Sequence, residues 1–224
     1  MTEDKPIAKP IIDDATREKM ALMFSGEVYL PDDVDGFFFD LQAAQRDLQL
    51  ELNATPLTNP KRRTELMQAF FGAAGEGLYL ECPVYANWGC NTYWGERCYA
   101  NFNLTLVDDG EIFIGSHTMI GPNVTLVATG HPVRPDLRYQ GAQYSLPVHI
   151  GENVWIGANV TVLPGVTIGD NAVIGANSLV TKDIPANTVA YGSPCKVIRE
   201  INERDDVYYW RDRQFSERFK LKEQ

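Results

Sequence analysis

A single histidine stands where the most regular part of this sequence is broken. His131 lies in the stretch TLVATGHPVRP, between Gly130 and Pro132, and the chain has three histidines in all. An imidazole generally titrates near neutrality, so it can take a proton from a hydroxyl group that attacks an electrophile. The alternative is a structural histidine that satisfies backbone groups at the start of a loop.

Two adjacent carboxylates are candidates to assist such a reaction. Asp108 and Asp109 end the stretch LTLVDD and could orient the hydroxyl groups of an acceptor. A polar two-residue turn explains them equally well from the sequence alone. There is no GxSxG motif for a serine nucleophile, so direct attack within a ternary complex is the simpler chemistry.

Three cations near the end of the regular region could bind phosphate groups: Lys182, Lys196 and Arg199. The chain as a whole is acidic, with 30 Asp and Glu against 20 Lys and Arg and a formal net charge of -10. This balance argues against a nucleic acid partner, which needs a basic face. Ordinary surface charge is the alternative explanation for the three cations.

Composition also bears on the compartment. No apolar run reaches the roughly 18 residues of a membrane span, and the start MTEDKPIAKPIIDD is acidic and broken by proline, unlike a secretory signal. The four cysteines form no CxxC pair. We therefore expect reduced thiols and a cytoplasmic protein without a membrane partner.

The elements that must position His131 belong to a six-residue repeat. Aliphatic residues recur on both sides of it, at Ile114, Ile120 and Leu126 and then at Ile150, Ile156, Val162, Ile168, Ile174 and Val180. This period fits neither an α-helix nor a simple strand. It predicts a parallel β-helix of triangular cross-section, in which three units make a coil of about 18 residues. The general rule for parallel crossovers favours a right-handed coil, and the spacing does not override it.

The repeat is interrupted around His131. Ile150 follows Ile114 by 36 positions, or two whole coils, but the in-phase residues between Leu126 and Ile150 are Pro132, Arg138 and Tyr144. None of the three is aliphatic. We therefore predict that residues of about 131–147 leave the solenoid as a loop, with His131 at its root, where functional residues are often found.

The rest of the chain divides into flanking segments. We predict a disordered extension at 1–14, a helical cap at 15–76, the β-helix at 77–195 and a C-terminal helical tail at 196–224. One helix places five residues on one face, at Phe37, Leu41, Ala44, Leu48 and Leu52. Another starts at Asn59 and Pro60 and carries Leu66 and Phe70 inward. These helices are predicted to cover one open end of the solenoid, and the tail to pack Tyr208, Tyr209 and Trp210.

Several motifs, occurring in order, resemble the maltose/galactoside O-acetyltransferase family, hexapeptide-repeat acyltransferases with a left-handed β-helix. They are SGEVY, NPKRRTELMQAFF, YANFNLTLVDD, TGHPV, GENVWIGANVTVLPGVTIGDNAVIGANSLVTKDIP and GSPCKVIREI. The resemblance covers about residues 16–205. It implies a left-handed prism, a homotrimer, acetyl-coenzyme A as donor, a sugar-like hydroxyl as acceptor and no metal.

The same resemblance implies roles for individual residues. It makes His131 the catalytic base and gives acceptor-binding roles to Asn87, Tyr99, Asn101 and Asp109. Asn87 stands where the sugar enzymes tend to have serine, which leaves the sugar open, and Asp32 is a loose match for a further family carboxylate. The cofactor positions are Ala158, Ala176, Thr181, Lys182, Lys196 and Arg199.

Some residues have a less specific role in this interpretation. A backbone N–H near Ala158 could stabilise the oxyanion of acetyl transfer. Trp88 and Trp155 could line the acceptor or cofactor groove, or could pack at a contact between subunits.

Three other functions remain open from the sequence. A zinc lyase of the carbonic anhydrase kind would need His117, His131 and His149 to converge. A non-catalytic β-helix scaffold would need neither the broken repeat nor the cluster of cations. An acyltransferase for antibiotics or other xenobiotics would use the same prism with a different acceptor.

Overall fold

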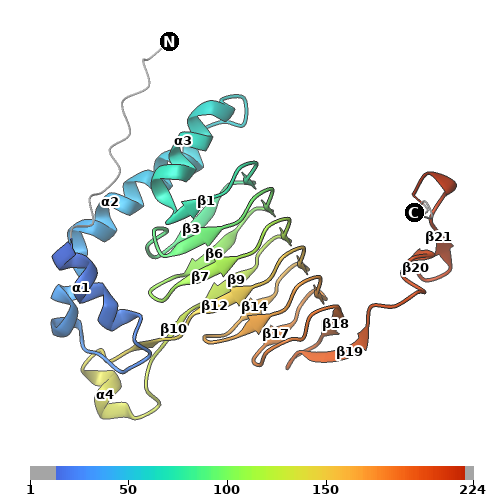
Figure 1. Ribbon diagram of the computed structural model, residues 1–224. Coiled ribbons are helices and arrows are strands. Elements are labelled where there is room, and N and C mark those ends of the chain that lie inside the picture. The colour runs from blue at the N-terminus through green and yellow to red at the C-terminus, as the bar shows by residue number, and fades with distance from the viewer. Residues whose placement is uncertain (1–13, 220–224) are drawn as a thin grey trace.

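The computed structural model describes residues 14–219, in which a group of helices stands at one end of a stack of short strands (Figure 1). The predicted extension, residues 1–14, lies outside the described residues except for Asp14, which begins the first helix. The stack is a parallel β-solenoid, so the predicted mainly β class with N-terminal helices is confirmed. Among the described helices, none is long and apolar enough to pass through a bilayer.

Three sheets form the faces of the solenoid, and successive coils add parallel strands to each of them. The first face contains β1 (Ala73–Ala74), β4 (Thr92–Trp94), β7 (Ile112–Ile114), β12 (Val148–Ile150) and β15 (Thr167–Ile168). The second face contains β3 (Val84–Ala86), β6 (Leu104–Val107), β9 (Thr125–Val127), β14 (Thr161–Val162) and β17 (Leu179–Val180). The third face contains β2 (Tyr79–Leu80), β5 (Tyr99–Ala100), β8 (Met119–Ile120), β13 (Trp155–Ile156), β16 (Val173–Ile174), β18 (Thr188–Tyr191) and the antiparallel edge strand β19 (Lys196–Glu200).

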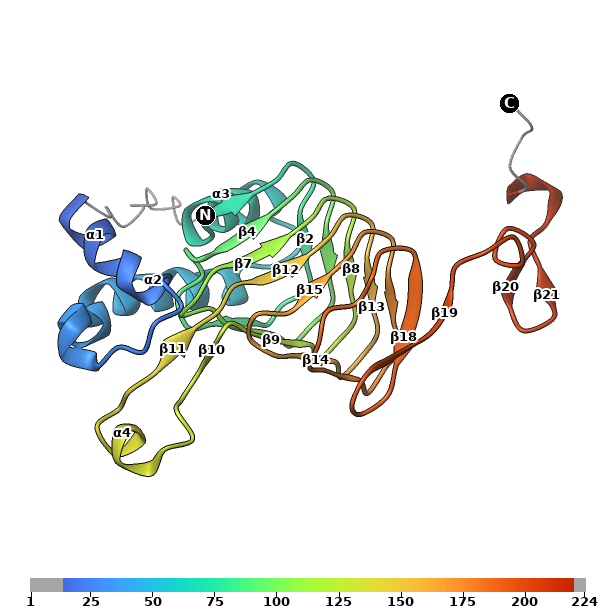
Figure 2. The ribbon, with the colours of Figure 1, turned by 60° about the horizontal axis from the view of Figure 1, so that its bottom comes forward.

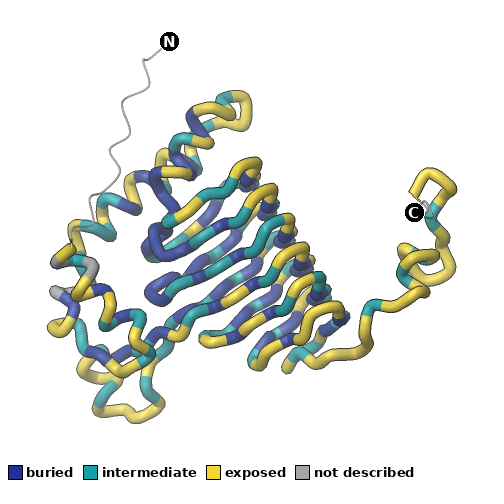
Figure 3. The backbone as a smooth tube through the Cα atoms, in the orientation of Figure 1, coloured by how far each residue is buried: buried dark blue, intermediate teal, exposed yellow. Residues whose placement is uncertain are grey.

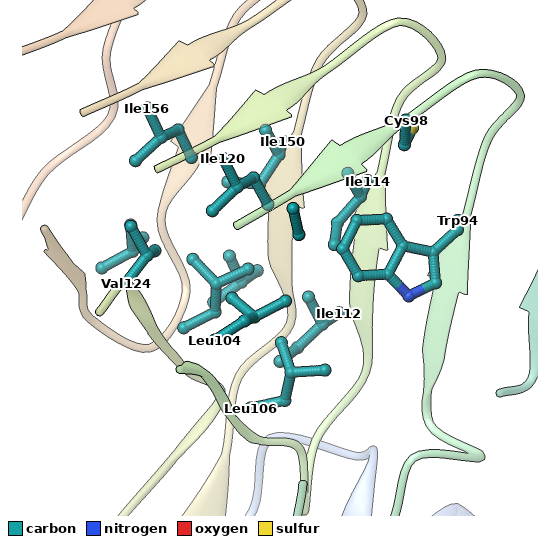
Figure 4. Close-up of a cluster of buried hydrophobic side chains, with 14 of the residues drawn as sticks. Trp94, Cys98, Leu104, Leu106, Ile112, Ile114, Ile120, Val124, Ile150 and Ile156 are labelled. Carbon is teal, nitrogen blue, oxygen red and sulfur yellow. The ribbon is translucent and has the colours of Figure 1, made fainter. Parts of the chain in front are cut away.

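The predicted aliphatic residues stack inside the solenoid in one column per face. Ile114, Ile150 and Ile168 are register partners on the first face. The second and third faces have the matching columns Leu126, Val162, Val180 and Ile120, Ile156, Ile174. All of these side chains are buried, and Figure 4 shows how several of them meet in the interior. Each such burial stabilises the fold by about 1.5–3 kcal/mol.

Asparagines make many of the turns between faces. Asn123, Asn159 and Asn177 each have a φ of 58°, in the left-handed region that asparagine tolerates better than most residues. Some of them also bond from coil to coil, since the side-chain amide of Asn153 donates to Asn171 Oδ1 at 2.9 Å. The turns therefore repeat from coil to coil as the interior does.

The first coils are longer than predicted. Tyr79 pairs with Tyr99, and Tyr99 pairs with Met119, so each of these coils spans 20 residues. The solenoid begins at β1, Ala73–Ala74, ahead of the predicted boundary at residue 77. The two added residues per coil move the inward positions out of the six-residue period, which is why the repeat is visible in the sequence only from Ile114.

The predicted interruption is a hairpin that projects from the solenoid. It consists of β10 (Thr129–Gly130), the short helix α4 (Pro135–Tyr139) and β11 (Tyr144–Ser145), and Figure 2 shows it standing clear of the coils. Ile114 pairs directly with Ile150. The 36 positions between them therefore hold one coil and this hairpin, and the solenoid resumes in register beyond the predicted interruption.

The N-terminal helices cover the first coil. They are α1 (Asp14–Met23), the 3-10 helix η1 (Pro31–Val34), α2 (Asp35–Ala54) and α3 (Pro60–Phe70). Asn59 caps α3 as predicted, with its side-chain oxygen accepting from the Arg62 N–H at 3.3 Å. Leu52, Leu66 and Phe71 belong to the same buried core as the solenoid interior. These contacts place the helices against the first coil, at the end where the sequence predicts a cap.

A buried guanidinium holds the cap on the coil. Arg63 is 5% exposed, and it donates to the carbonyls of Thr55 at 2.9 Å and Leu80 at 2.7 Å. Thr55 follows the end of α2 and Leu80 lies in β2. The side chain therefore satisfies backbone groups of both elements.

The predicted C-terminal helix is wrong. Lys196–Glu200 pairs with β18 as an antiparallel strand, and the chain then forms β20 (Tyr208–Trp210), β21 (Arg213–Gln214) and the 3-10 turn η2 (Glu217–Phe219). The open edge of the last coil offers unpaired backbone groups to a segment rich in β-branched and aromatic residues, and this pairing overrides helical propensity. Tyr209 and Trp210 are more than half exposed, and Figure 3 shows most of the tail as exposed.

Candidate active site

His131 stands on the hairpin just beyond β10. Its side chain is exposed, and Nδ1 lies 2.8 Å from the carbonyl oxygen of Ala142 on the returning strand. A carbonyl can only accept a hydrogen bond, so Nδ1 carries the proton in the neutral ring. The basic lone pair is then on Nε2. A general base needs a nitrogen of this kind.

Asn87 and Asp109 form a polar pair beside the hairpin root. The Asn87 amide donates to Asp109 Oδ2 at 2.7 Å, and the Trp88 indole N–H lies 3.4 Å from Oδ1. Asp109 is followed by Gly110, at which an added Cβ would stand 2.8 Å from the Cβ of Ser145 in β11. The structure therefore brings two predicted acceptor residues to the base of the element that carries His131.

Asp108 lies behind this pair and has no access to solvent. Its carboxylate accepts from the Trp88 backbone N–H at 2.8 Å and from the Thr92 hydroxyl at 3.0 Å. Burial raises the pKa of the Asp108 carboxyl to about 7, and these two hydrogen bonds oppose the rise. Asp108 therefore supports the site from the interior and does not meet an acceptor, contrary to the prediction from sequence.

Tyr99 and Asn101 lie elsewhere in the chain. Tyr99 belongs to the third face, stacked on Tyr79 with ring centroids 6.0 Å apart, and Asn101 follows it at the next corner. The hairpin with His131 leaves from β9 on the second face. A single chain thus distributes the predicted acceptor residues over two faces.

Three further residues from the sequence analysis lie in different surroundings from one another. Trp88 is fully buried and packs edge-on against Phe38, so it does not line a groove. Trp155 is 54% exposed on the third face, where its register partner is Met119. Asp32 is exposed on η1 and follows Tyr29 by three residues. Because Tyr29 pairs with Gln143 of the hairpin, Asp32 lies on the hairpin side of the cap.

The predicted cofactor residues follow the later coils. Ala158 and Ala176 occupy equivalent corners of successive coils, and the Asn177 N–H donates to the Ala158 carbonyl at 2.9 Å. That carbonyl is therefore engaged within the solenoid, which limits the backbone groups that the corner offers to a ligand. The two coils approach closely at Gly157, because an added Cβ there would come within 2.7 Å of the Ala176 nitrogen.

The three predicted cations are exposed near the last coil. The Cys195 N–H donates to the Leu179 carbonyl at 2.8 Å, so Lys196, the next residue, lies near β17. Lys182 comes shortly after the end of the same strand. Arg199 forms a two-pronged ion pair with Asp205, at 2.6 and 2.7 Å. Arg199 therefore already has an acidic partner that the sequence did not reveal.

The three histidines do not converge as a zinc site would require. His149 stacks on Phe113 on the first face, with ring centroids 4.9 Å apart, and His117 sits in an exposed turn with a φ of 62°. Between residues 14 and 219, no group of three or more histidine, cysteine or acidic side chains could hold a metal ion. The geometry thus opposes the zinc lyase alternative.

Residues missed by sequence reasoning surround the hairpin root. Tyr29 is buried against Gln143 and Ser145, and Asn91 donates to the Asp108 carbonyl at 2.9 Å. Tyr29 lies in the SGEVY motif, so the sequence marked the segment but not the contact. Nothing in the local pattern around Gln143 and Ser145 points to a partner more than 100 positions away.

Comparisons with known proteins agree with this architecture. Residues 22–75 match the maltose acetyltransferase hexapeptide capping motif, and residues 147–182 match the bacterial transferase hexapeptide of six repeats. A galactoside O-acetyltransferase of Lactococcus lactis is 53% identical over 184 residues, which cover 82% of this chain and 88% of the relative. One of Escherichia coli is 53% identical over 167 residues, 75% of this chain and 82% of the relative. A solved galactoside acetyltransferase in complex with coenzyme A superposes with a TM-score of 0.83 at 45% identity, covering 90% of this chain and 98% of its own.

Proposed function

The chain belongs to the maltose/galactoside O-acetyltransferase family of hexapeptide-repeat enzymes, and from this premise we propose that it transfers the acetyl group of acetyl-coenzyme A to a hydroxyl of a sugar-like acceptor. It is an acetyl-coenzyme A-dependent O-acetyltransferase, with the acyl donor as co-substrate. The observation that carries the role of His131 is its Nδ1 bond to the Ala142 carbonyl at 2.8 Å.

The proposed reaction is a direct transfer without an acyl-enzyme. Nε2 of His131 takes the proton as the acceptor oxygen attacks the thioester carbonyl carbon. The tetrahedral intermediate then collapses, the carbon–sulfur bond breaks, and the imidazolium returns the proton to the departing thiolate. The products are the acetyl ester and free coenzyme A, so the histidine ends in its starting state.

We assign acceptor binding to Asp109 and Asn87. In the described part of the chain, Asn87 donates to Oδ2 of Asp109 and the Trp88 indole lies near Oδ1. A carboxylate has roughly four lone-pair positions, so these two contacts leave others over. The remaining positions suit the paired hydroxyl groups of a sugar. Asn87 holds the carboxylate in place and adds its own amide oxygen as an acceptor.

A homotrimer would unite the two groups of acceptor residues. The third face presents exposed apolar side chains, with Tyr79, Met119 and Trp155 each about half exposed. Packing this face against the hairpin of a neighbouring copy would bring Tyr99 and Asn101 toward His131. Light scattering should therefore give three times the chain mass of 25.1 kDa. A stable monomer at micromolar concentration would remove both the trimer and the shared site.

We propose that the cofactor lies along the later coils, with its phosphates near Lys182, Lys196 and Arg199. Replacing Lys196 and Arg199 together with alanine should raise the KM for acetyl-coenzyme A by roughly tenfold or more, since each removes charge-assisted bonds. The KM for acetyl-pantetheine, which lacks the nucleotide phosphates, should change little. Lys61→Ala at the opposite end of the molecule serves as the control. An equal rise for both donors would show that the charges do not meet the phosphates.

An acceptor screen tests the proposed function as a whole. Release of the coenzyme A thiol would be followed with sugars, thiogalactosides, oligosaccharides and small amines. We expect turnover with a sugar or thiogalactoside and a much lower rate with amines. Turnover with amines or xenobiotics alone would reassign the acceptor class while leaving the acetyl donor in place.

A further inference from the structure

Tyr29 reaches the root of the hairpin from the N-terminal cap. It is 1% exposed and forms an antiparallel bridge with Gln143. The Tyr29 N–H donates to the Gln143 carbonyl at 2.9 Å, and the Gln143 N–H donates to the Tyr29 carbonyl at 3.0 Å. Gln143 directly follows Ala142, whose carbonyl binds His131. The cap therefore pairs with the returning strand immediately beside the carbonyl that orients the histidine.

The Tyr29 hydroxyl joins a chain of hydrogen bonds across both strands of the hairpin. The Gln143 amide donates to the hydroxyl at 2.6 Å, and the hydroxyl lies 3.1 Å from Ser145 Oγ. Ser145 donates to Thr129 Oγ1 at 3.4 Å, and Thr129 donates to the Tyr144 carbonyl at 2.9 Å. The Gln143 amide N–H at one end can only donate, and the Tyr144 carbonyl at the other end can only accept. All hydrogen bonds of the series therefore run in the same direction, from Gln143 to Tyr144. In that direction the Tyr29 hydroxyl donates to Ser145.

This series of hydrogen bonds fixes the offset between the two strands of the hairpin. Thr129 lies on the outgoing strand, two residues before His131, whereas Ser145 lies in the returning strand β11 and Gln143 comes just before it. Because the position of the Ala142 carbonyl relative to His131 depends on the same offset, the hydroxyl network and the histidine bond are mechanically connected. Burial raises the pKa of Tyr29, with the negative charge of Asp109 as a smaller contribution in the same direction. The hydroxyl thus keeps the proton that it donates.

We propose that Tyr29 is a positioning residue for His131: by locking the hairpin strands it keeps the Ala142 carbonyl on Nδ1 and leaves Nε2 as the basic nitrogen. The inference rests on the proposed role of His131 as base. It assigns a specific task in the reaction to the N-terminal cap, which covers the solenoid end with other residues. A role in stability alone would not require the hydroxyl to connect both strands next to the histidine.

The test is Tyr29→Phe, read by the tautomer of His131 and by kinetics. The ¹⁵N chemical shifts of the imidazole distinguish a proton on Nδ1 from one on Nε2 in the free enzyme. We expect the Nδ1–H form in the wild type and a mixture of both forms in the variant. The kcat should fall roughly tenfold or more, since small misplacements of a catalytic group have large effects, while the KM for acetyl-coenzyme A stays unchanged.

Two further variants make the outcome decisive. Ser145→Ala interrupts the same chain from the other side and should shift the tautomer in the same way, even if Tyr29→Phe folds poorly. Tyr139→Phe removes the hydroxyl of a residue that is 93% exposed on the same hairpin, and this variant should behave as wild type. A wild-type tautomer and kcat in folded Tyr29→Phe and Ser145→Ala would overturn the positioning role, whatever the melting temperature. Full activity in His131→Ala would instead overturn the proposed base, and the tautomer measurement would still report separately on Tyr29.

Discussion

Replacement of His131 by alanine is expected to lower the turnover number by roughly 10²–10⁴-fold, the usual contribution of a general base. The residue is exposed and its Nδ1 bonds to the Ala142 carbonyl on the hairpin, so its loss should leave the solenoid core intact. Binding of acetyl-coenzyme A, the oligomeric state and the melting temperature should therefore stay near wild type. Steady-state kinetics with the best acceptor from the screen, together with calorimetry for cofactor binding, measure these quantities.

A second histidine provides the matched control for this experiment. His117 is exposed in a turn with a φ of 62°, so His117→Asn removes an imidazole while keeping a residue that tolerates the left-handed backbone. Its turnover should equal that of the wild type. If His131→Ala loses stability but keeps its turnover per folded site, the histidine only holds the hairpin and the base lies elsewhere.

Asp108→Asn is expected to change how the stability of the protein depends on pH. An aspartate in the unfolded chain loses its proton near pH 4, but burial raises the pKa of Asp108 in the folded protein to about 7. Between these values the unfolded state releases the proton and the folded state keeps it, so the folded state becomes less stable as pH rises. Each pH unit costs about 1.4 kcal/mol, and the loss over the window is on the order of 4 kcal/mol.

The asparagine removes this titration and keeps the hydrogen bonds. Its carboxamide oxygen can accept from the Trp88 N–H, and its amide can donate to the Thr92 hydroxyl. Urea unfolding at pH 5 and pH 8 should show that the variant gains stability relative to wild type at the higher pH. Asp212→Asn on the exposed tail is the control and should follow the wild type. An identical pH dependence in Asp108→Asn and wild type would mean that Asp108 is already ionised throughout this range.

Patterns within the chain were enough to predict the repeating part of the fold. The inward columns such as Ile114, Ile150 and Ile168, the cap at Asn59 and the exit of the chain near His131 all follow from the order of residue types. They are predictable because each six-residue unit meets the same surroundings as the unit one coil away. A local pattern therefore reports burial directly.

Other features depend on pairing that no local pattern contains. The first coils have 20 residues and do not follow the six-residue period. The tail formed strands because an open sheet edge lay beside it. Arg199 pairs with Asp205 in the turn that follows β19, and Trp88 is buried against residues of the N-terminal helices. Apart from the Arg199 pair, the neighbours that decide the outcome come from a different coil or a different segment.

The sequence by itself determined the solenoid, its helical cap, its family and the histidine at the hairpin root. Only the tertiary structure decided that Tyr29 meets Gln143 across 114 positions, that Asp108 has no exposed surface while Asp109 is 7% exposed beside the hairpin root, and that Tyr99 lies on another face from His131. The physical reason is that periodicity encodes which side of a strand faces inward. The tautomer of an imidazole, the pKa of a carboxyl group and the assembly of a site depend on atoms that folding brings together from distant parts of the chain.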